Sequence, residues 1–330
     1  MLSRHFLRAK ALQTIYAGVA RQVSSDKDIY SDFNFNVLKL DDLGILQMST
    51  LEWLTFSAER IIESESQKFN PSSNEIANLQ RIANNQFIGR LCSIKDYKSN
   101  YDRLKIDWSN HFDLFRKVVT SLKQTKQFEL YSEIVTPTFD DDKNIAILAF
   151  KQLMNDTSLR DVINERELLW EDDFDQIAQY VYMLLKELNT DNMFEDAPCP
   201  HVYDSKNEKE YNDYCFARQL ALDTFNHMDD VLPMIKKHLQ NWDLDRVALM
   251  DILLINMAVT EFTCCPSIPE RVTVDEYIEL SKEFSTEKSK LFINGILDKI
   301  LIELRVAGKI VKNDRGLYDP DIDGDTPPEN

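Results

Sequence analysis

Glycine is scarce in this chain of 330 residues: only seven are present, about a third of average usage. Doubly wound nucleotide-binding folds need glycines in their phosphate loops, and neither G-x-G-x-x-G nor G-x-x-x-x-G-K-[ST] occurs. No run of 18 apolar residues is present, so the sequence predicts no membrane span. Because 43% of the residues are apolar, the chain can still form a packed core, and we expect a helical protein rather than a nucleotide enzyme.

Residues for catalysis and metal binding are also few. The five cysteines have no zinc-site spacing, and they indicate reduced, mostly buried thiols of a cytoplasmic protein. Cys199-Pro200-His201 supplies only two potential metal ligands, which is half of a site. The histidines are scattered, and no serine or cysteine lies in a recognisable nucleophile motif. We therefore expect a protein that is not an enzyme and that holds no metal and no cofactor.

The charge is unevenly distributed. A net charge of −18 argues against indiscriminate binding of nucleic acid, yet residues 1–25 carry four basic side chains and no acid, which makes this segment +4 and the remainder −22. A local basic patch can bind phosphate on an acidic protein, with few contacts and a marked dependence on salt. A basic, acid-free, amphipathic start is also typical of a mitochondrial transit peptide, and that alternative stays open.

The most informative stretch runs from Ile268 to Lys299. Thr273 and Glu276 have the spacing of a capping box, and apolar residues then recur at helical spacing as far as Phe284. The polar pair Ser285-Thr286 interrupts the pattern before a second apolar stripe begins. This second stripe consists of Phe292, Ile296, Leu297, Ile300 and Leu304. The spacing predicts two helices that meet at a short polar corner.

Asn294-Gly295 interrupts the second stripe with a signal of its own. In isolation this dipeptide favours a β-hairpin. The residues after it keep helical spacing, so we expect a helix, in which a glycine costs about 1 kcal/mol relative to alanine. We therefore expect Gly295 to admit a close neighbour.

The stretch resembles the family of the transcription antitermination factor NusB. The matching positions are Ile268-Pro269, Val272, Asp275-Glu276, Ile278-Glu279-Leu280, Lys282, Phe284, Glu287, Ser289 and Phe292-Ile293-Asn294-Gly295-Ile296-Leu297-Asp298-Lys299. The resemblance implies an all-helical, cytoplasmic RNA-binding protein that pairs with the small ribosomal subunit protein NusE. Together the two would bind the boxA element of nascent RNA and support processive transcription by RNA polymerase.

The resemblance also implies a set of contact residues. Residues 3–20 form an amphipathic pattern that is similar to the first helix of the family, whose basic N-terminal end touches RNA. If the fold is NusB-like, this end returns to the corner at Ser285 to Ser289, and Arg8 lies beside the bend near Lys288. The predicted RNA-binding residues are Arg4, His5, Arg8, Lys10, Tyr16, Glu287, Lys288, Ser289, Phe292 and Asn294.

These residues would have different roles in binding RNA. Arg4, Arg8 and Lys10 would neutralise phosphates, while Tyr16 and Phe292 would stack on bases, unless they simply pack in the core. Asp251 and Glu261 fit the central helix of the family and are predicted to contact the protein partner.

The chain is longer than the resemblance requires, because almost two hundred residues separate the first helix from the rest. We predict four parts: residues 1–20 as the first helix of a NusB-like core, 21–210 as a helical insertion, 211–312 as the remaining core, and 313–330 as an acidic disordered tail. Within the insertion we expect a polar connection at residues 24–36 and a loop at 63–75. The stretch 244–262, apolar nearly all round, predicts a helix buried at the centre of a bundle.

A pattern recurs within this chain: a helix that opens on phenylalanine, a tryptophan, and an apolar-Asp pair that starts a longer helix. The tryptophans of the three copies are Trp108, Trp170 and Trp242. Such recurrence predicts tandem helical units near residues 87–130 and 150–190, with a third copy that leads into the core. Ordinary helices with buried aromatic side chains are the alternative.

The sequence thus predicts an all-α protein, a NusB-like helical bundle with inserted tandem helical units. The predicted function is that of an RNA-binding antitermination factor. A non-catalytic protein-interaction scaffold that does not bind RNA is the alternative, because stacked helices with an acidic surface suit protein partners.

Overall fold

The computed structural model describes residues 2–193, 195–196, 207–239 and 247–317. No described residue lies in a strand, so the all-α prediction is confirmed. In chain order the helices are α1 (Arg4–Ala20), α2 (Asp26–Ser66), α3 (Ser73–Ala83), α4 (Gln86–Ser93), α5 (Lys95–Arg103), η1 (Ser109–His111), α6 (Phe112–Lys123), α7 (Lys126–Glu133), α8 (Phe139–Met154), α9 (Thr157–Arg166), η2 (Leu168–Trp170), α10 (Phe174–Glu187), α11 (Glu208–His238), α12 (Leu249–Cys264), α13 (Glu270–Phe284) and α14 (Ser289–Val306).

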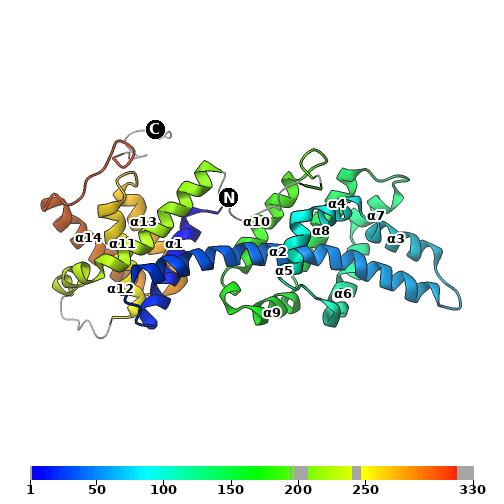
Figure 1. Cartoon of the computed structure of the whole chain (residues 1–330), viewed down its shortest axis with the longest axis horizontal. Helices are drawn as coiled ribbons and strands as arrows, with labels where there is room; N and C mark the ends of the chain where they lie inside the picture. The colour runs from blue at the N-terminus through cyan, green and yellow to red at the C-terminus, as the bar shows by residue number, and fades with distance from the viewer. Residues whose placement is uncertain (1, 194, 197–206, 240–246, 318–330) are drawn as a thin grey trace. The chain divides into compact units, whose positions relative to one another are not determined.

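The chain divides into two compact units. Unit 1 comprises residues 38–204, and unit 2 comprises residues 2–37 together with 205–330. The long helix α2 contributes to both, because the division falls inside it (Figure 1). The assignment of the parts as a core, an insertion and a tail stays a prediction, and most of the predicted tail lies outside the described residues.

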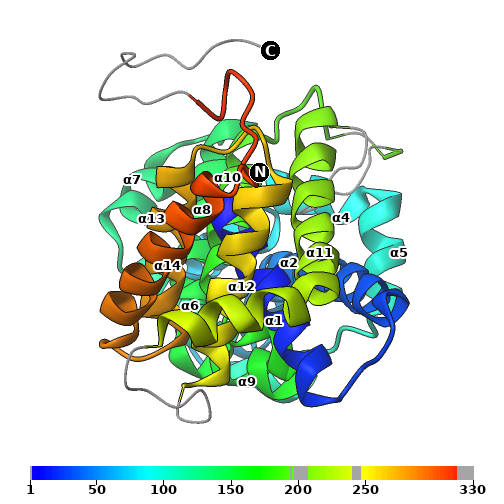
Figure 2. The ribbon, with the colours of Figure 1, turned by 90° about the vertical axis from the view of Figure 1, so that its left-hand side faces the viewer.

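In unit 2 the helices pack around α12 (Figure 2). This helix contacts α1, α11, α13 and α14, and every residue from Leu253 to Phe262 is buried. The prediction of a central helix that is apolar nearly all round is therefore confirmed for its described part. Asn256 and Glu261 are polar residues within this buried stretch.

In unit 1, helix α8 contacts α4, α6 and α10. Two tryptophans of this unit donate hydrogen bonds to α2. The indole nitrogen of Trp108 donates to Ser49 Oγ at 3.0 Å, and that of Trp170 donates to the Lys39 carbonyl at 2.9 Å. Each tryptophan accompanies a 3-10 turn that leads into a helix beginning with Phe-Asp, either Phe112 or Phe174. The two segments share this order of elements. Their origin as tandem copies stays a prediction, and Trp242 of the third copy lies outside the described residues.

Two predicted connections are wrong. Residues 26–36 belong to α2, because Ile29, Phe33 and Val37 recur at helical spacing and their side chains are buried. The loop predicted at residues 63–75 is shorter, since α2 continues to Ser66 and α3 begins at Ser73. At the start of α2, helical packing overrides a polar local composition.

Two predictions about α13 and α14 are also corrected. The capping box at Thr273 does not form, because α13 begins at Glu270 and Thr273 is buried within the helix. The helix across Asn294-Gly295 is confirmed. However, a Cβ added at Gly295 would meet nothing within 4 Å, so this glycine admits no close neighbour in the described part of the protein.

The cysteines differ from expectation as well. Cys92, Cys215 and Cys265 are partly exposed and Cys264 is exposed, all four as free thiols. Cys199-Pro200-His201 lies outside the described residues. None of the described helices combines the length and apolarity that a bilayer crossing requires.

Candidate nucleic-acid interface

An ion pair in the core of unit 2 joins α1 to α12. The Arg8 guanidinium donates from Nε and Nη2 to the two carboxylate oxygens of Glu261, each at 2.8 Å. The exposed fractions of the two side chains are 2% and 0%. Glu261 also accepts hydrogen bonds from Thr273 Oγ1 at 2.9 Å and Tyr277 Oη at 3.2 Å, both on α13. Because every charge is matched, the cluster fixes the position of α1 against α12 and α13.

Arg8 is therefore a structural cation rather than an exposed one. Burial opposes its charge, but the hydrogen bonds and the negative charge of Glu261 outweigh this effect and raise the pKa of Arg8. Its third nitrogen, Nη1, lies 3.4 Å from Glu276. Lys10 is buried too, and its ammonium donates to Gln13 Oε1 at 2.6 Å. Neither of these two predicted phosphate contacts is presented at the surface.

The first turn of α1 carries polar side chains that are partly exposed. Arg4 Nε donates to Asp213 of α11 at 2.6 Å, and its side chain keeps 37% exposure. His5 lies between two carboxylates of α13, at 2.9 Å from Glu276 and 3.0 Å from Glu283. Glu283 lies next to the last residue of α13, so the start of α1 reaches the end of α13. Arg8 contacts α13 about two turns earlier, at Glu276.

The corner between α13 and α14 is held by one buried carboxylate. Asp251 of α12 accepts hydrogen bonds from Ser285 Oγ at 2.6 Å and Ser289 Oγ at 3.0 Å. Thr286 Oγ1 lies 2.9 Å from Ser289 Oγ, which completes the network. Ser289 is consequently buried, whereas Glu287 and Lys288 are exposed. The hydroxyls shape the corner, and the charged side chains form its surface.

The remaining predicted contacts lie at different depths. Phe292 and Asn294 on α14 are half-buried, while Tyr16, at the far end of α1, is 42% exposed. The structure thus brings Arg4, His5 and the end of α13 together, and among the described residues no hydrogen bond or ring contact links Tyr16 to them.

Asp251 and Glu261, the predicted partner contacts, are buried and bonded within unit 2. A role in direct contact with a partner stays a prediction for both, and their observed bonds are internal.

Sequence reasoning missed Lys290, which is exposed one residue beyond Ser289. No ion pair of Lys288 or Lys290 occurs within the described residues. The signal that could have found Lys290 is its place in the first turn of α14, beside Lys288 on the polar corner. The buried hydroxyl partners of Glu261 had no such signal, because only packing joins them.

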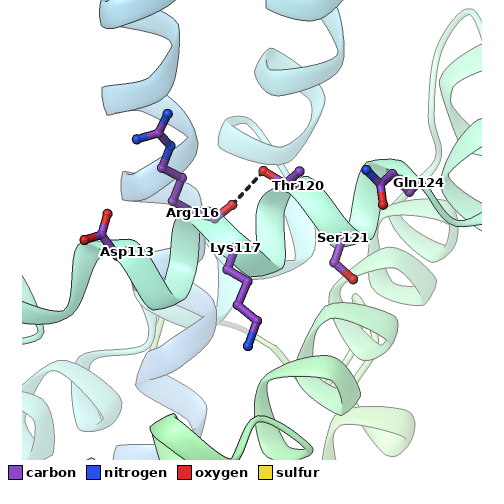
Figure 3. A pocket seen from close by; sticks show the side chains of 6 residues that line it. All are labelled: Asp113, Arg116, Lys117, Thr120, Ser121 and Gln124. Carbon is purple, nitrogen blue, oxygen red and sulfur yellow. Dashed lines mark hydrogen bonds between the residues drawn. The ribbon is translucent and has the colours of Figure 1, made fainter.

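Unit 1 carries a hollow with polar lining (Figure 3). It has a volume of about 430 Å³, and five side chains of α6 line it together with Gln124, the residue after the helix. Figure 3 shows Arg116 and Lys117 pointing to opposite sides of the helix, and Lys117 pairs with Asp156 at 2.6 Å. These two cations do not converge on one ligand position.

Comparison with known proteins gives the helical domain its family. The sequence profile of the NusB family matches residues 174–301, which run from the first residue of α10 into α14. Transcription antitermination protein NusB of Salinibacter ruber is 40% identical over 106 residues, which is 32% of this chain and 66% of the relative. The NusB protein of Finegoldia magna is 39% identical over 90 residues, or 27% of this chain and 66% of the relative. That of Chloroherpeton thalassium is 36% identical over 104 residues, or 32% of this chain and 49% of the relative. No solved structure gives a significant match.

The fold defines the class of this domain: it is all-helical, with a buried ion pair and a polar corner between two helices. Residues 174–301 of the chain thus form a NusB-family domain. The aligned part spans just under two thirds of the length of the first two relatives, and the N-terminal region is additional to it. The matched region does not include α1, which nevertheless packs on α11, α12 and α13.

Proposed function

We propose that unit 2 is the RNA-binding part of a transcription antitermination factor. The observation that carries the proposal is the NusB family match, whose relatives are named transcription antitermination proteins. The geometry supports it because the first turn of α1 lies beside the end of α13, which creates one polar surface from two distant parts of the chain. Its ligand is single-stranded RNA that contains a boxA-type element.

The exposed side chains make the contacts in this proposal. Arg4, His5 and Lys288 approach phosphates, with Lys290 as an additional cation. Phe292 on α14 is half-buried, and bases stack readily on aromatic rings. Tyr16 offers a second exposed ring on α1.

Polar groups at the corner between α13 and α14, and on α14 itself, complete the proposed surface. Glu287 and Asn294 can hydrogen-bond base edges, while the Ser289 hydroxyl is bonded to Asp251 and holds the corner in place. Arg8 and Lys10 act by fixing α1 rather than by touching RNA.

The protein partner in this proposal is the ribosomal protein NusE, as part of the transcription elongation complex. Asp251 and Glu261 would influence pairing through the corner and the α1–α13 contact that they stabilise. A direct contact would require either carboxylate to leave its buried network, at a considerable cost.

Fluorescence anisotropy with a labelled boxA RNA tests the proposal. Binding is measured with and without NusE, and against a scrambled single strand of the same composition. We expect NusE to increase affinity for boxA and not for the scrambled strand. A paired substitution, Lys288→Ala with Lys290→Ala, should weaken boxA binding about tenfold, since two phosphate contacts are lost.

Lys309→Ala is the matched control, because Lys309 is an exposed lysine just beyond the other end of α14. It should leave affinity unchanged. Equal affinity for boxA and scrambled RNA in the presence of NusE would contradict the proposal, and the full absence of RNA binding would favour the scaffold function.

A further inference from the structure

His5 in the first turn of α1 touches two carboxylates through its two ring nitrogens. Nδ1 lies 2.9 Å from Glu276 Oε2, and Nε2 lies 3.0 Å from Glu283 Oε1. A neutral imidazole has one N–H donor and one acceptor nitrogen, whereas an ionised carboxylate only accepts. Two such bonds require a proton on both nitrogens. The geometry is that of an imidazolium ion.

The surrounding charges support this protonation state. The hydrogen bond from His5 lowers the pKa of Glu276, against the opposing effect of burial, and the nearby Arg8 lowers it further. The hydrogen bond to Glu276 raises the pKa of His5, burial opposes the shift, and Glu283 adds to it. Glu276 therefore stays ionised while the ring keeps its second proton.

The other charges near His5 are paired with each other. The charged groups that contact His5, or that pair with a group near it, are Arg4 and Arg8 on α1, Glu276 and Glu283 on α13, Asp213 on α11 and Glu261 on α12. Arg4 is matched by Asp213, and Arg8 is matched by Glu261. His5 is thus the cation that balances Glu283, and it shares Glu276 with Arg8, whose Nη1 lies 3.4 Å from that carboxylate. Loss of its proton would remove the hydrogen bond from His5 to one of these two carboxylates.

The position of His5 in α1 adds to the effect. A cation in the first turn of a helix is disfavoured by the helix dipole, so α1 itself does not explain why the charge is there. The two carboxylates of α13 offset this cost and tie the start of α1 to the end of α13. The same contact joins the two halves of the surface to which we assign RNA.

We infer that His5 is a proton-operated clamp: the doubly protonated ring bridges Glu276 and Glu283, and its deprotonation loosens the start of α1 and makes the adjoining RNA surface more negative. The second half of this inference rests on the proposed function. RNA affinity should therefore fall as pH rises through the ionisation of His5, by roughly three- to tenfold, the size expected for one partly exposed charge.

Proton titration of the histidine side chains by NMR, on the whole protein without RNA, tests the clamp alone. We expect His5 to ionise above its ordinary value of about 6.5. The Glu276→Gln and Glu283→Gln variants should each move this ionisation downwards, because each removes an ionised acceptor. An ionisation of His5 at or below the ordinary value would overturn the clamp, whatever the protein binds.

Anisotropy with boxA RNA and NusE between pH 6 and 9 tests the coupling. His5→Arg keeps a permanent cation and should bind RNA at high pH as well as the unchanged protein does at low pH. His5→Gln should bind weakly throughout, and both variants should lose the His5-dependent part of the pH profile. His227→Gln, which alters an exposed histidine on α11, is the control and should retain the full profile.

The outcomes separate the two proposals. A high ionisation of His5 together with no RNA binding at any pH would reject the proposed function and the coupling while the clamp stands. RNA binding with the same pH profile in the unchanged protein, in His5→Arg and in His5→Gln would overturn the coupling and leave the function intact.

Discussion

Arg8 and Glu261 show how a single buried pair can organise a domain. Their carboxylate–guanidinium contact has two hydrogen bonds, and Thr273 and Tyr277 satisfy the remaining acceptor positions of Glu261. A buried pair of this kind adds little net stability compared with apolar residues, but either partner alone is costly. The pair therefore selects one position for α1, against α12 and α13.

Removal of either partner tests this interpretation. Arg8→Ala should lower the free energy of unfolding by about 3–5 kcal/mol, because Glu261 is left charged and buried. The double substitution Arg8→Met with Glu261→Leu should cost much less, since no charge remains without a partner. Urea denaturation measures both, and Arg116→Ala, on the exposed face of α6, should stay within about 0.5 kcal/mol. Equal losses in the single and double variants would argue against a matched pair.

The His5 contact also predicts how stability depends on pH. The folded-state pKa of His5 is raised, so its contribution is fully present below about pH 6.5 and is lost as pH rises through the raised value. The folded-state pKa of Glu276 is lowered, so its contribution is present above its ordinary value and is lost as pH falls through the lowered one. Both contributions to stability are complete only at a pH above the ordinary pKa of Glu276 and below the ordinary pKa of His5.

Thermal unfolding at a series of pH values can resolve the His5 contribution. As pH rises above about 6.5, the midpoint of the unchanged protein should fall more steeply than that of His5→Gln. Parallel curves for the two proteins would show that the His5 bridge does not contribute.

At the scale of the element, α14 carries a glycine that its own packing does not need. An added Cβ at Gly295 meets nothing within 4 Å, and the neighbouring Leu291 is exposed. Gly295→Ala should therefore raise the free energy of unfolding by about 0.5–1 kcal/mol through helix propensity. Gly316→Ala is the contrasting variant and should destabilise, because its Cβ would overlap the Pro266 carbonyl oxygen.

A binding measurement on Gly295→Ala adds a functional readout. If RNA or NusE approaches α14 closely at this position, the variant should gain stability and lose affinity together. A stabilised variant with unchanged affinity would place the ligand elsewhere on unit 2.

The two tryptophans of unit 1 act on α2 as hydrogen-bonding anchors. Trp108→Phe and Trp170→Phe should each cost about 1–2 kcal/mol, because Ser49 Oγ or the Lys39 carbonyl loses its donor and the ring shrinks. Denaturation curves that report on unit 1 measure the loss. Trp53→Phe should cost less, since Trp53 and its partner Tyr101 Oη are only partly buried. Losses that do not differ among the three variants would remove the special role of the anchors.

At the scale of the whole molecule, charge decides what kind of RNA binding is possible. A chain with a net charge of −18 repels polyanions at long range, so binding depends on a few local cations. Each phosphate contact with a single strand contributes about 0.7 to the slope of log affinity against log salt concentration. Lys288→Ala with Lys290→Ala should therefore reduce that slope by about 1.4. Lys309→Ala should leave the slope unchanged, and an unchanged slope in the double variant would exclude these lysines from phosphate contact.

The sequence pattern was sufficient to predict those helices whose apolar residues recur at regular helical spacing. The helices around the polar corner, the unbroken helix through Asn294-Gly295 and the buried α12 were all predictable from spacing. The start of α2 was not, because its local composition is polar and its buried side chains find their partners only in unit 2. The capping box failed for a similar reason: Thr273 is drawn into the core by Glu261, a residue on another helix.

For the candidate site, the sequence by itself determined which chemical groups were available: an acid-free cationic start, a polar corner and the NusB resemblance. The tertiary structure alone decided which of these groups are buried and which reach the surface. Arg8 and Lys10 share the charge of Arg4, and no local pattern distinguishes them, but burial depends on the helices that surround α1. The bridge from His5 to Glu276 and Glu283 joins residues about 270 positions apart, so only the folded chain could reveal it.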